Sequence, residues 1–190
     1  MSACICTLAP PPVDVDAMLR YARADITSTA LARQTIDELG ARFQYTVCYR
    51  TYPVRALADG ELDLGFCRVH SASLTRFVGG RPYVLVFGAT VGLTTDAAVI
   101  RYGHTSPTRA LFADALGIER IESLCDAFCM DKVGTTSRFS PGYGDLPLEM
   151  QRQIFEALPL GKIGMTLNDN LLITPTKSVT ALVAVDKEVE

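Results

Sequence analysis

The sequence is poor in the side chains that build most metal and catalytic centres. It has no tryptophan and only two histidines among its 190 residues. Its six cysteines contain no Cys-x-x-Cys pair, and the pairs Cys4 with Cys6 and Cys125 with Cys129 each lack the second half of a zinc site. Cys125 and Cys129 stand one helical turn apart, which favours small residues that face a core. Cysteines used in this way are typical of a reducing cytosol.

The sequence also lacks a strong excess of charge and a long apolar run. Its net charge of −3 is not the basic footprint of a nucleic-acid binder. No positive region precedes an apolar stretch at the N-terminus, so we expect no secretory signal. The longest apolar runs, such as 83–87, have the length of a strand and are too short to span a bilayer. These absences predict a cytoplasmic protein with neither a nucleic-acid nor a membrane partner.

Phosphate-binding and nucleophile motifs are missing as well. No Gly-x-Gly-x-x-Gly follows a predicted strand, which disfavours a Rossmann-type enzyme. There is no nucleophile elbow and no phosphate loop. What the sequence does have is an apolar fraction of 48%, the value of an ordinary protein with a core. We therefore expect one folded module over residues 1–190 that has no self-sufficient catalytic centre.

Apolar spacing and capping residues predict several helices. Ser28 is expected to cap the second helix, which Gly40 ends, and Ser106-Pro107 is a strong start for the longest one. The last helix is expected to be entered through Asp145. The predicted helices cover 14–21, 28–39, 71–79, 94–102, 106–128 and 146–158.

Alternating and apolar runs predict strands between these helices. Residues 44–52 alternate, as in a half-buried strand, whereas 83–90 is nearly all apolar and is expected to be central. The other predicted strands are 61–69, 171–174 and 179–185, the last two completing the sheet. Residues 1–13, which include three consecutive prolines, are expected to form an extended leader. Together these elements predict an α+β fold, with a curved and mainly antiparallel sheet flanked by helices.

The most informative segment is 138–143, Arg-Phe-Ser-Pro-Gly-Tyr. It places a fixed cation, a proline-glycine bend and a phenol within six residues. Alone, the segment is also compatible with a surface turn, in which Arg138 is an ordinary ion-pair member and Tyr143 a packing residue. Downstream come Ile-Gly-Met at 163–165 and Ser-Val at 178–179. Upstream, the long predicted helix carries Cys-Asp-Ala-Phe at 125–128, which brings Asp126 towards the loop.

In this order the motifs resemble the activation domain of cobalamin-dependent methionine synthase, in particular its short stand-alone members. In that family an Arg-x-x-x-Gly-Tyr loop binds S-adenosylmethionine. Segments at 19–21, 47–54 and 85–92 support the resemblance, which extends from about residue 18 to residue 185. The family is known for the α+β fold predicted above.

The resemblance implies a set of residues that bind S-adenosylmethionine. Arg138, Pro141, Gly142 and Tyr143 match the family loop, and Phe139 and Ser140 occupy its variable positions. Asp126 stands where the family has a glutamate, one methylene longer.

Chemistry assigns roles within this set. The Arg138 guanidinium suits the ligand carboxylate, and Asp126 suits its ammonium or ribose. Tyr143 offers a π-face to the sulfonium, and main-chain groups near Phe139 and Ser140 suit the adenine edge. Asp126 is alternatively a solvated acid or the partner of Arg120 or Lys132. A second family acid lies just before the loop, where this chain has Asp131 and Lys132 without a secure match.

The resemblance also implies partners. The chain has no Asp-x-His-x-x-Gly cobalamin signature, so the corrinoid is expected on a separate methionine synthase chain. The electron that reduces its cobalt is expected to come from a flavodoxin-like or iron–sulfur donor. The protein then acts as a reactivation subunit that supports reductive methylation of oxidised cobalamin. Two alternatives stay open: a non-catalytic adaptor, and a reactivation factor for another corrinoid methyltransferase.

Overall fold

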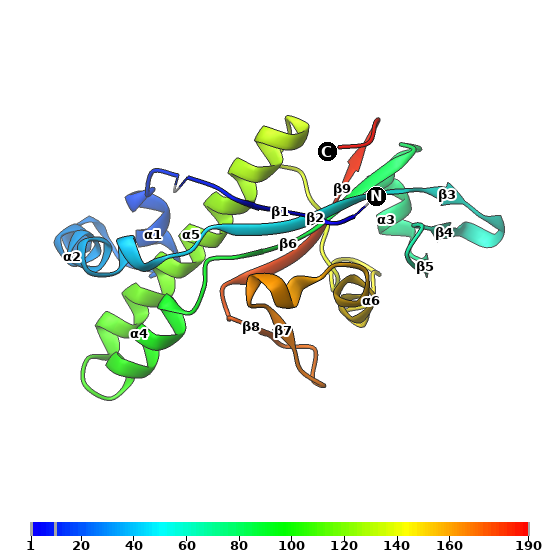
Figure 1. The fold of residues 1–190 in the computed structure, drawn as a ribbon. Helices are drawn as coiled ribbons and strands as arrows, with labels where there is room; N and C mark the ends of the chain where they lie inside the picture. The colour runs from blue at the N-terminus through cyan, green and yellow to red at the C-terminus, as the bar shows by residue number, and fades with distance from the viewer. Residues whose placement is uncertain (1, 10, 190) are drawn as a thin grey trace.

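A four-stranded antiparallel sheet is the centre of the fold (Figure 1). The computed structural model describes residues 2–9 and 11–189. The strands lie in the order β1-β2-β6-β9, and each neighbouring pair is antiparallel. Their bounds are β1 Cys4–Thr7, β2 Thr46–Pro53, β6 Tyr83–Thr90 and β9 Ser178–Val185. The predicted α+β class with an antiparallel sheet flanked by helices is confirmed.

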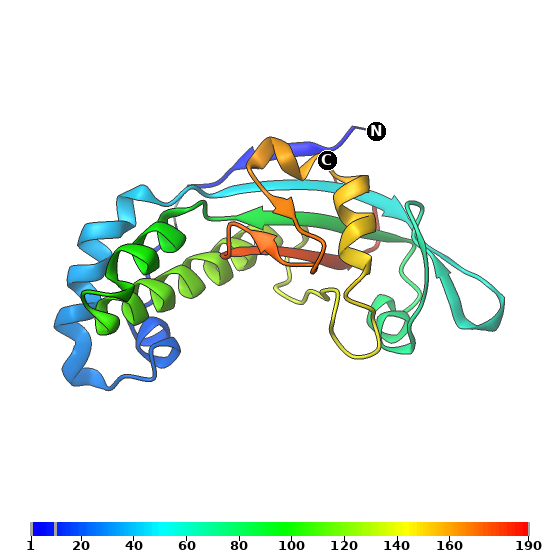
Figure 2. The ribbon, with the colours of Figure 1, turned by 90° about the horizontal axis from the view of Figure 1, so that it is seen from below.

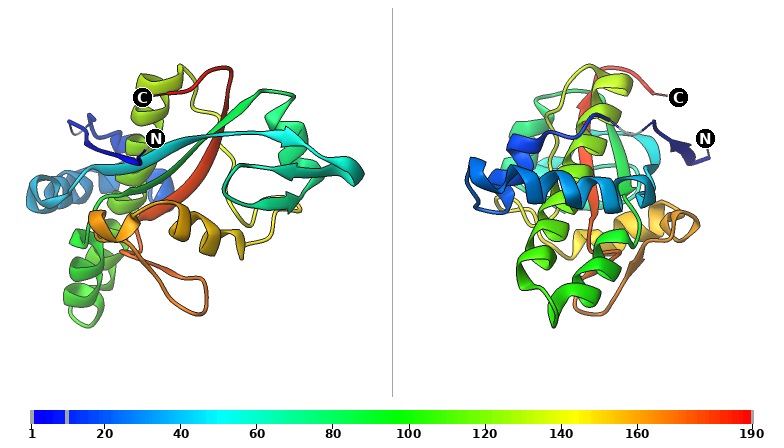
Figure 3. Two further views of the ribbon diagram at one scale, coloured as in Figure 1. Left: turned by 45° about the vertical axis from the view of Figure 1, so that its right-hand side comes forward. Right: turned by 90° about the vertical axis from the view of Figure 1, so that its left-hand side faces the viewer.

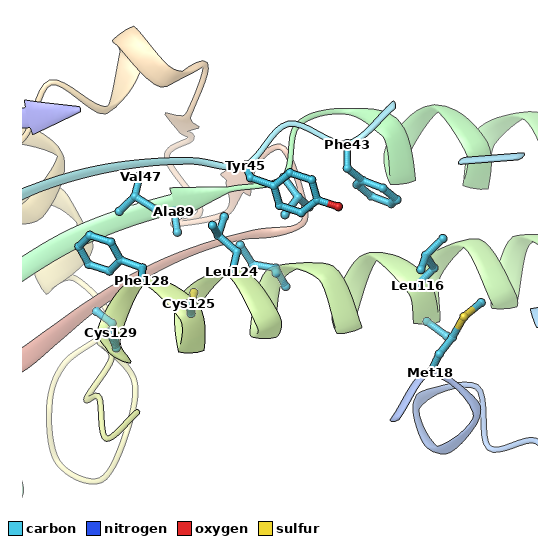
Figure 4. Packing of buried hydrophobic residues seen from close by; sticks show 14 of the residues in the cluster. Met18, Phe43, Tyr45, Val47, Ala89, Leu116, Leu124, Cys125, Phe128 and Cys129 are labelled. Atoms are coloured by element: carbon cyan, nitrogen blue, oxygen red, sulfur yellow. The ribbon is translucent and has the colours of Figure 1, made fainter. Parts of the chain in front are cut away.

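One face of the sheet is covered by a long helix. Helix α5 crosses the sheet, and three shorter helices pack around its N-terminal half (Figure 2). Phe128 of α5 contacts Tyr49 and Phe87, with ring centroids 5.2 and 5.1 Å apart. Figure 4 shows this core, in which Cys125 and Cys129 are fully buried as expected. The bounds are α1 Val15–Tyr21, α2 Thr29–Leu39, α4 Thr94–Gly103 and α5 Pro107–Val133, with short 3₁₀ turns η1 Ile26–Ser28 and η2 Gly40–Arg42.

The opposite face carries a second core. Helix α6 (Met150–Ala157), the 3₁₀ turn η4 (Leu160–Ile163) and the hairpin β7 (Thr166–Leu167) with β8 (Ile173–Thr174) lie on it (Figures 1 and 2). The β2 strand is buried on both faces, with Cys48 in this core and Tyr49 in the other. The prediction of a half-buried strand is therefore wrong, because helices cover both sides. The predicted strand 171–174 was also assigned to the wrong sheet, since β8 pairs with β7.

A small β-structure and a short helix lie at one end of the sheet (Figure 3). The predicted strand 61–69 is instead a hairpin, since Gly65 has φ +76° and turns the chain between two strands. The elements are β3 Arg55–Ala56, η3 Ala58–Gly60, β4 Glu61–Asp63, β5 Arg68–His70 and α3 Ala72–Val78.

A buried ion pair holds the N-terminal segment. Glu119 and Arg120 of α5 are 2% and 1% exposed, and they bind one another. Arg120 donates to the carbonyls of Pro11 and Pro12 at 2.6 and 2.9 Å, and the Asp14 amide donates to Glu119 at 3.1 Å. Arg120 is thus not the partner of Asp126.

Two helix starts differ from the sequence prediction. Ser28 precedes α2, but its side chain forms no capping hydrogen bond. Helix α6 begins at Met150, four residues later than expected, and Asp145 serves another helix. Part of the expected leader is strand β1, whereas Met1 and Pro10 lie outside the described residues. In the described part of the chain, every helix is too short or too polar to cross a membrane.

Candidate functional site

The arginine loop crosses the free edge of β9. After Gly134 ends α5, Phe139 forms an isolated antiparallel bridge with Leu182, in which each amide donates to the other's carbonyl at 2.9 and 2.8 Å. The Phe139 ring packs against Phe77, with centroids 5.3 Å apart. The amide and the carbonyl of Phe139 are therefore paired with Leu182, whereas the adenine contact expected from main-chain groups near Phe139 and Ser140 stays a prediction. Phe139 anchors the loop.

Glycines allow the bend that follows. Gly142 has φ +89°, and its amide donates to the Leu146 carbonyl at 3.0 Å. Gly144 has φ +58°, and a Cβ there would lie 2.6 Å from the Ser73 hydroxyl of α3. Both positions need glycine, because residues with a side chain rarely adopt such positive φ angles, and because there is no room for a Cβ at Gly144. The bend leaves Tyr143 68% exposed, which excludes the alternative of a core-packing residue.

Asp145 fastens this bend to α3. Its carboxylate accepts hydrogen bonds from the Ser71 hydroxyl at 2.6 Å and from the amides of Ala72 and Ser73 at 2.8 and 3.1 Å. These bonds, the one from Ser71 above all, lower the pKa of Asp145 below its ordinary value. Asp145 is therefore the cap of α3 rather than the entry to α6.

The Asp145 cap predicts a dependence of stability on pH. A carboxylate with a lowered folded-state pKa stabilises the fold above its ordinary pKa of about 3.9 and loses that contribution as the pH falls below it. The urea midpoint of Asp145→Ala should lie below that of wild type by a constant amount from pH 5 to 7. Below about pH 4 the difference should shrink. Asp37→Ala, at an exposed position, is the control; a difference for Asp145→Ala that stays constant down to pH 2 would contradict the capping role.

Arg138 joins the loop to α5. Its side chain is 17% exposed and lies between two acids of that helix, Glu122 and Asp126, with Asp126 Oδ1 at 2.5 Å from Nη1. Burial has the largest single effect on the pKa of Arg138 and lowers it, but the hydrogen bond to Asp126 and the nearby negative charges together outweigh burial, so the net pKa is raised. Two of the predicted site residues, Asp126 and Arg138, are thus brought together. One cation between two carboxylates leaves a local charge of −1.

A groove of about 560 Å³ opens beside this cluster. It includes four of the predicted residues, Arg138, Ser140, Pro141 and Tyr143, whereas Asp126, Phe139 and Gly142 do not line it. The rest of the lining comes from α5, the start of the loop, α6, β8 and the start of β9: Glu122, Thr136, Ser137, Gln151, Ile173, Ser178, Val179 and Thr180.

Several polar residues of the groove were missed from the sequence, among them Glu122 and Gln151. Glu122 stands four residues before Asp126, so both acids lie on one face of a helix, and this spacing was the available signal. Gln151 carries no comparable signal. Its side-chain oxygen is buried without a hydrogen-bond partner among residues 2–9 and 11–189. Asp131, in turn, pairs with the adjacent Lys132 at 3.7 Å.

A second cavity, a lysine and a cysteine of the described chain lie outside this groove. A larger hollow of about 690 Å³ lies further along β9, but only Ser137 of the arginine loop region lines both cavities. Lys177 is 14% exposed, and its Nζ binds Asp114 Oδ1 at 2.7 Å. Burial raises the pKa of Cys129 to about 11, which keeps this thiol protonated.

Comparison with known proteins identifies the fold. No family model matches the sequence. A search of curated proteins found no match either. Among solved structures, the chain is similar to the MetH reactivation domain bound to AdoHcy, with a TM-score of 0.69 and 14% sequence identity. The match covers 96% of this chain and 78% of the other.

The class defined by this likeness is an α+β reactivation-domain fold. The fold of this chain is that of the MetH reactivation domain, as the motif order predicted.

Proposed function

We propose that this protein binds S-adenosylmethionine in the groove beside the arginine loop and presents its methyl group to a corrinoid on a separate chain. It thereby serves as the reactivation subunit of a cobalamin-dependent methionine synthase. One observation carries the proposal: the groove is lined by Arg138, Ser140, Pro141 and Tyr143 of the predicted loop. The likeness to a reactivation domain bound to AdoHcy supports it.

The residues present fit the proposed ligand. S-adenosylmethionine carries a carboxylate, an ammonium and a sulfonium, so its net charge is +1. The Glu122–Arg138–Asp126 cluster has the complementary net charge of −1. The remaining guanidinium N–H groups of Arg138 suit the carboxylate, and the two acids suit the cationic groups. A volume of about 560 Å³ is in the usual range for small-molecule sites.

The chain's own contribution is positioning. Arg138 and Glu122 orient the amino-acid end of the ligand, and the anchored loop holds the sulfonium towards the open side of the groove. When reduced, the partner's cobalt supplies the nucleophile that accepts the methyl group. The protein alone should therefore be inert, and its contact with the corrinoid chain should surround the arginine loop.

A spectroscopic assay tests this proposal. Oxidised corrinoid client, reductant and S-adenosylmethionine are mixed, and methylcobalamin formation is followed in the visible spectrum. Omitting the protein should abolish or strongly slow the conversion, and Arg138→Ala should have the same effect as omission. Equal rates with and without the protein for every candidate client would favour the adaptor alternative.

Glu122 should contribute to charge selectivity. Because AdoHcy lacks the sulfonium charge, Glu122→Gln should weaken S-adenosylmethionine binding more than AdoHcy binding. The differential loss should be about 0.5–1 kcal/mol, since the pair is partly exposed. Calorimetric titration of both ligands at low and high salt measures it, with Glu156→Gln, an exposed position on α6, as the control. Equal losses for the two ligands would contradict an electrostatic role.

A further inference from the structure

Gln151 of helix α6 lines the groove beside the arginine loop. Its main-chain N–H donates to the carbonyl of Leu148, and Leu148 is the residue that a Cβ on Gly142 would meet, at 3.3 Å. Helix α6 is tied to the β7–β8 turn, because Arg152 donates to the Asp169 carbonyl at 2.8 Å. Gln151 therefore comes from a helix that packs near Gly142 through Leu148, whereas Glu122 comes from α5.

The groove lining includes two kinds of side chain. Glu122 and Arg138 suit the charged amino-acid part of a ligand, whereas Pro141, Tyr143 and Ile173 have ring and aliphatic surfaces that suit a flat, weakly polar group. In a ligand with one charged part and one purine part, the purine is expected against the second set.

An unpartnered buried carbonyl is costly. Such a group has lost its solvation by water, and a hydrogen bond from a ligand would replace that interaction. The Oε1 atom of Gln151 is in this state among the described residues. A glutamine amide pairs in a bidentate manner with adenine, accepting from the exocyclic amine and donating to a ring nitrogen. Its terminal torsion is broad, so the amide turns readily to meet such a group.

We propose that Gln151 reads the adenine ring of the bound ligand, accepting a hydrogen bond from the exocyclic amine. The inference rests on the proposed function, since it assigns one residue to the adenine part of that ligand. It makes Gln151 a specificity-determining residue for a 6-aminopurine. The carbonyl that lacks a donor in the free protein gains one when the ligand binds.

The test pairs two ligands with two variants. AdoHcy is compared with its 6-deamino analogue, which lacks the exocyclic amine. A 6-oxopurine is not a suitable comparison, because the glutamine amide could turn by 180° and donate to the oxygen at C6. Wild type should bind AdoHcy about tenfold more tightly than the analogue. Gln151→Met should bind both with nearly equal affinity, and Gln153→Met, at an exposed position on the same helix, should behave as wild type. Thermal unfolding checks that each variant is folded.

If Gln151→Met does not fold, Gln151→Glu takes its place in the test. Glutamate keeps the acceptor and loses the donor, so this variant should still prefer AdoHcy to the 6-deamino analogue. Equal weakening of both ligands in Gln151→Met, or a full preference retained in it, would overturn the inference and leave the proposed function intact. If wild type bound neither ligand, the proposed function would fail and this inference with it.

Discussion

Arg138→Ala should weaken S-adenosylmethionine binding by about 2–3 kcal/mol, because charge-assisted hydrogen bonds to the ligand carboxylate would be lost. The substitution also removes the link between the loop and the two acids of α5. Tyr143→Phe should cost less, about 1 kcal/mol, since only one hydrogen bond is lost. Isothermal calorimetry gives both values, with Arg68→Ala at an exposed position of β5 as the control.

The charge balance makes this prediction decisive. If Arg138 only neutralised Glu122 and Asp126, its removal would leave two uncompensated carboxylates and a local charge of −2. A cationic ligand would then bind as tightly as before or more tightly. Unchanged or increased affinity in a folded Arg138→Ala variant would therefore contradict the assignment of the arginine loop. A loss of affinity in spite of the more negative site would support it.

Arg120→Ala should lower the free energy of unfolding by about 3–5 kcal/mol, because it leaves the buried charge of Glu119 unpaired. It also removes the donors to the carbonyls of Pro11 and Pro12. The double variant Glu119→Leu with Arg120→Met should lose less than the single variant, since no buried charge remains.

Urea unfolding followed by circular dichroism measures these differences. Ligand binding at 15 °C should change little in a folded variant, because Glu119 and Arg120 contact the N-terminal segment and neither residue lines the groove. A single variant as stable as wild type would show that Glu119 finds another partner. A double variant less stable than the single one would show that the main-chain contacts outweigh the charge.

The main fold was predictable because its signals are local. The apolar run 83–90 marked the central strand, and Ser106-Pro107 with apolar residues three and four apart marked α5. What failed depended on distant partners. In the sequence, Asp145 has the position of a residue that begins the following helix. Only the folded chain shows that its Oδ2 accepts from the Ala72 amide at 2.8 Å. The hairpin is the exception, since its turn is local: Gly65 was taken as part of one strand, whereas at φ +76° it joins two.

The candidate site was predictable in part. The loop from Arg138 to Tyr143 and the approach of Asp126 followed from the motif order. Glu122 was missed because an acid on a polar helix face is usually solvated, and nothing local indicates that Arg138 will reach it. Phe139 was read as part of the binding surface, yet its pairing with Leu182 makes it the anchor of the loop. Gln151 lies on a different helix and enters the groove only through packing.

Calorimetric titration of the wild-type protein with S-adenosylmethionine tests the central claim most directly. A charged ligand with several contacts in a preformed groove commonly reaches roughly −8 kcal/mol, so we expect one site with a micromolar Kd. We also expect a rise in the thermal unfolding midpoint at saturating ligand. No heat of binding and no thermal shift at millimolar ligand would contradict the account.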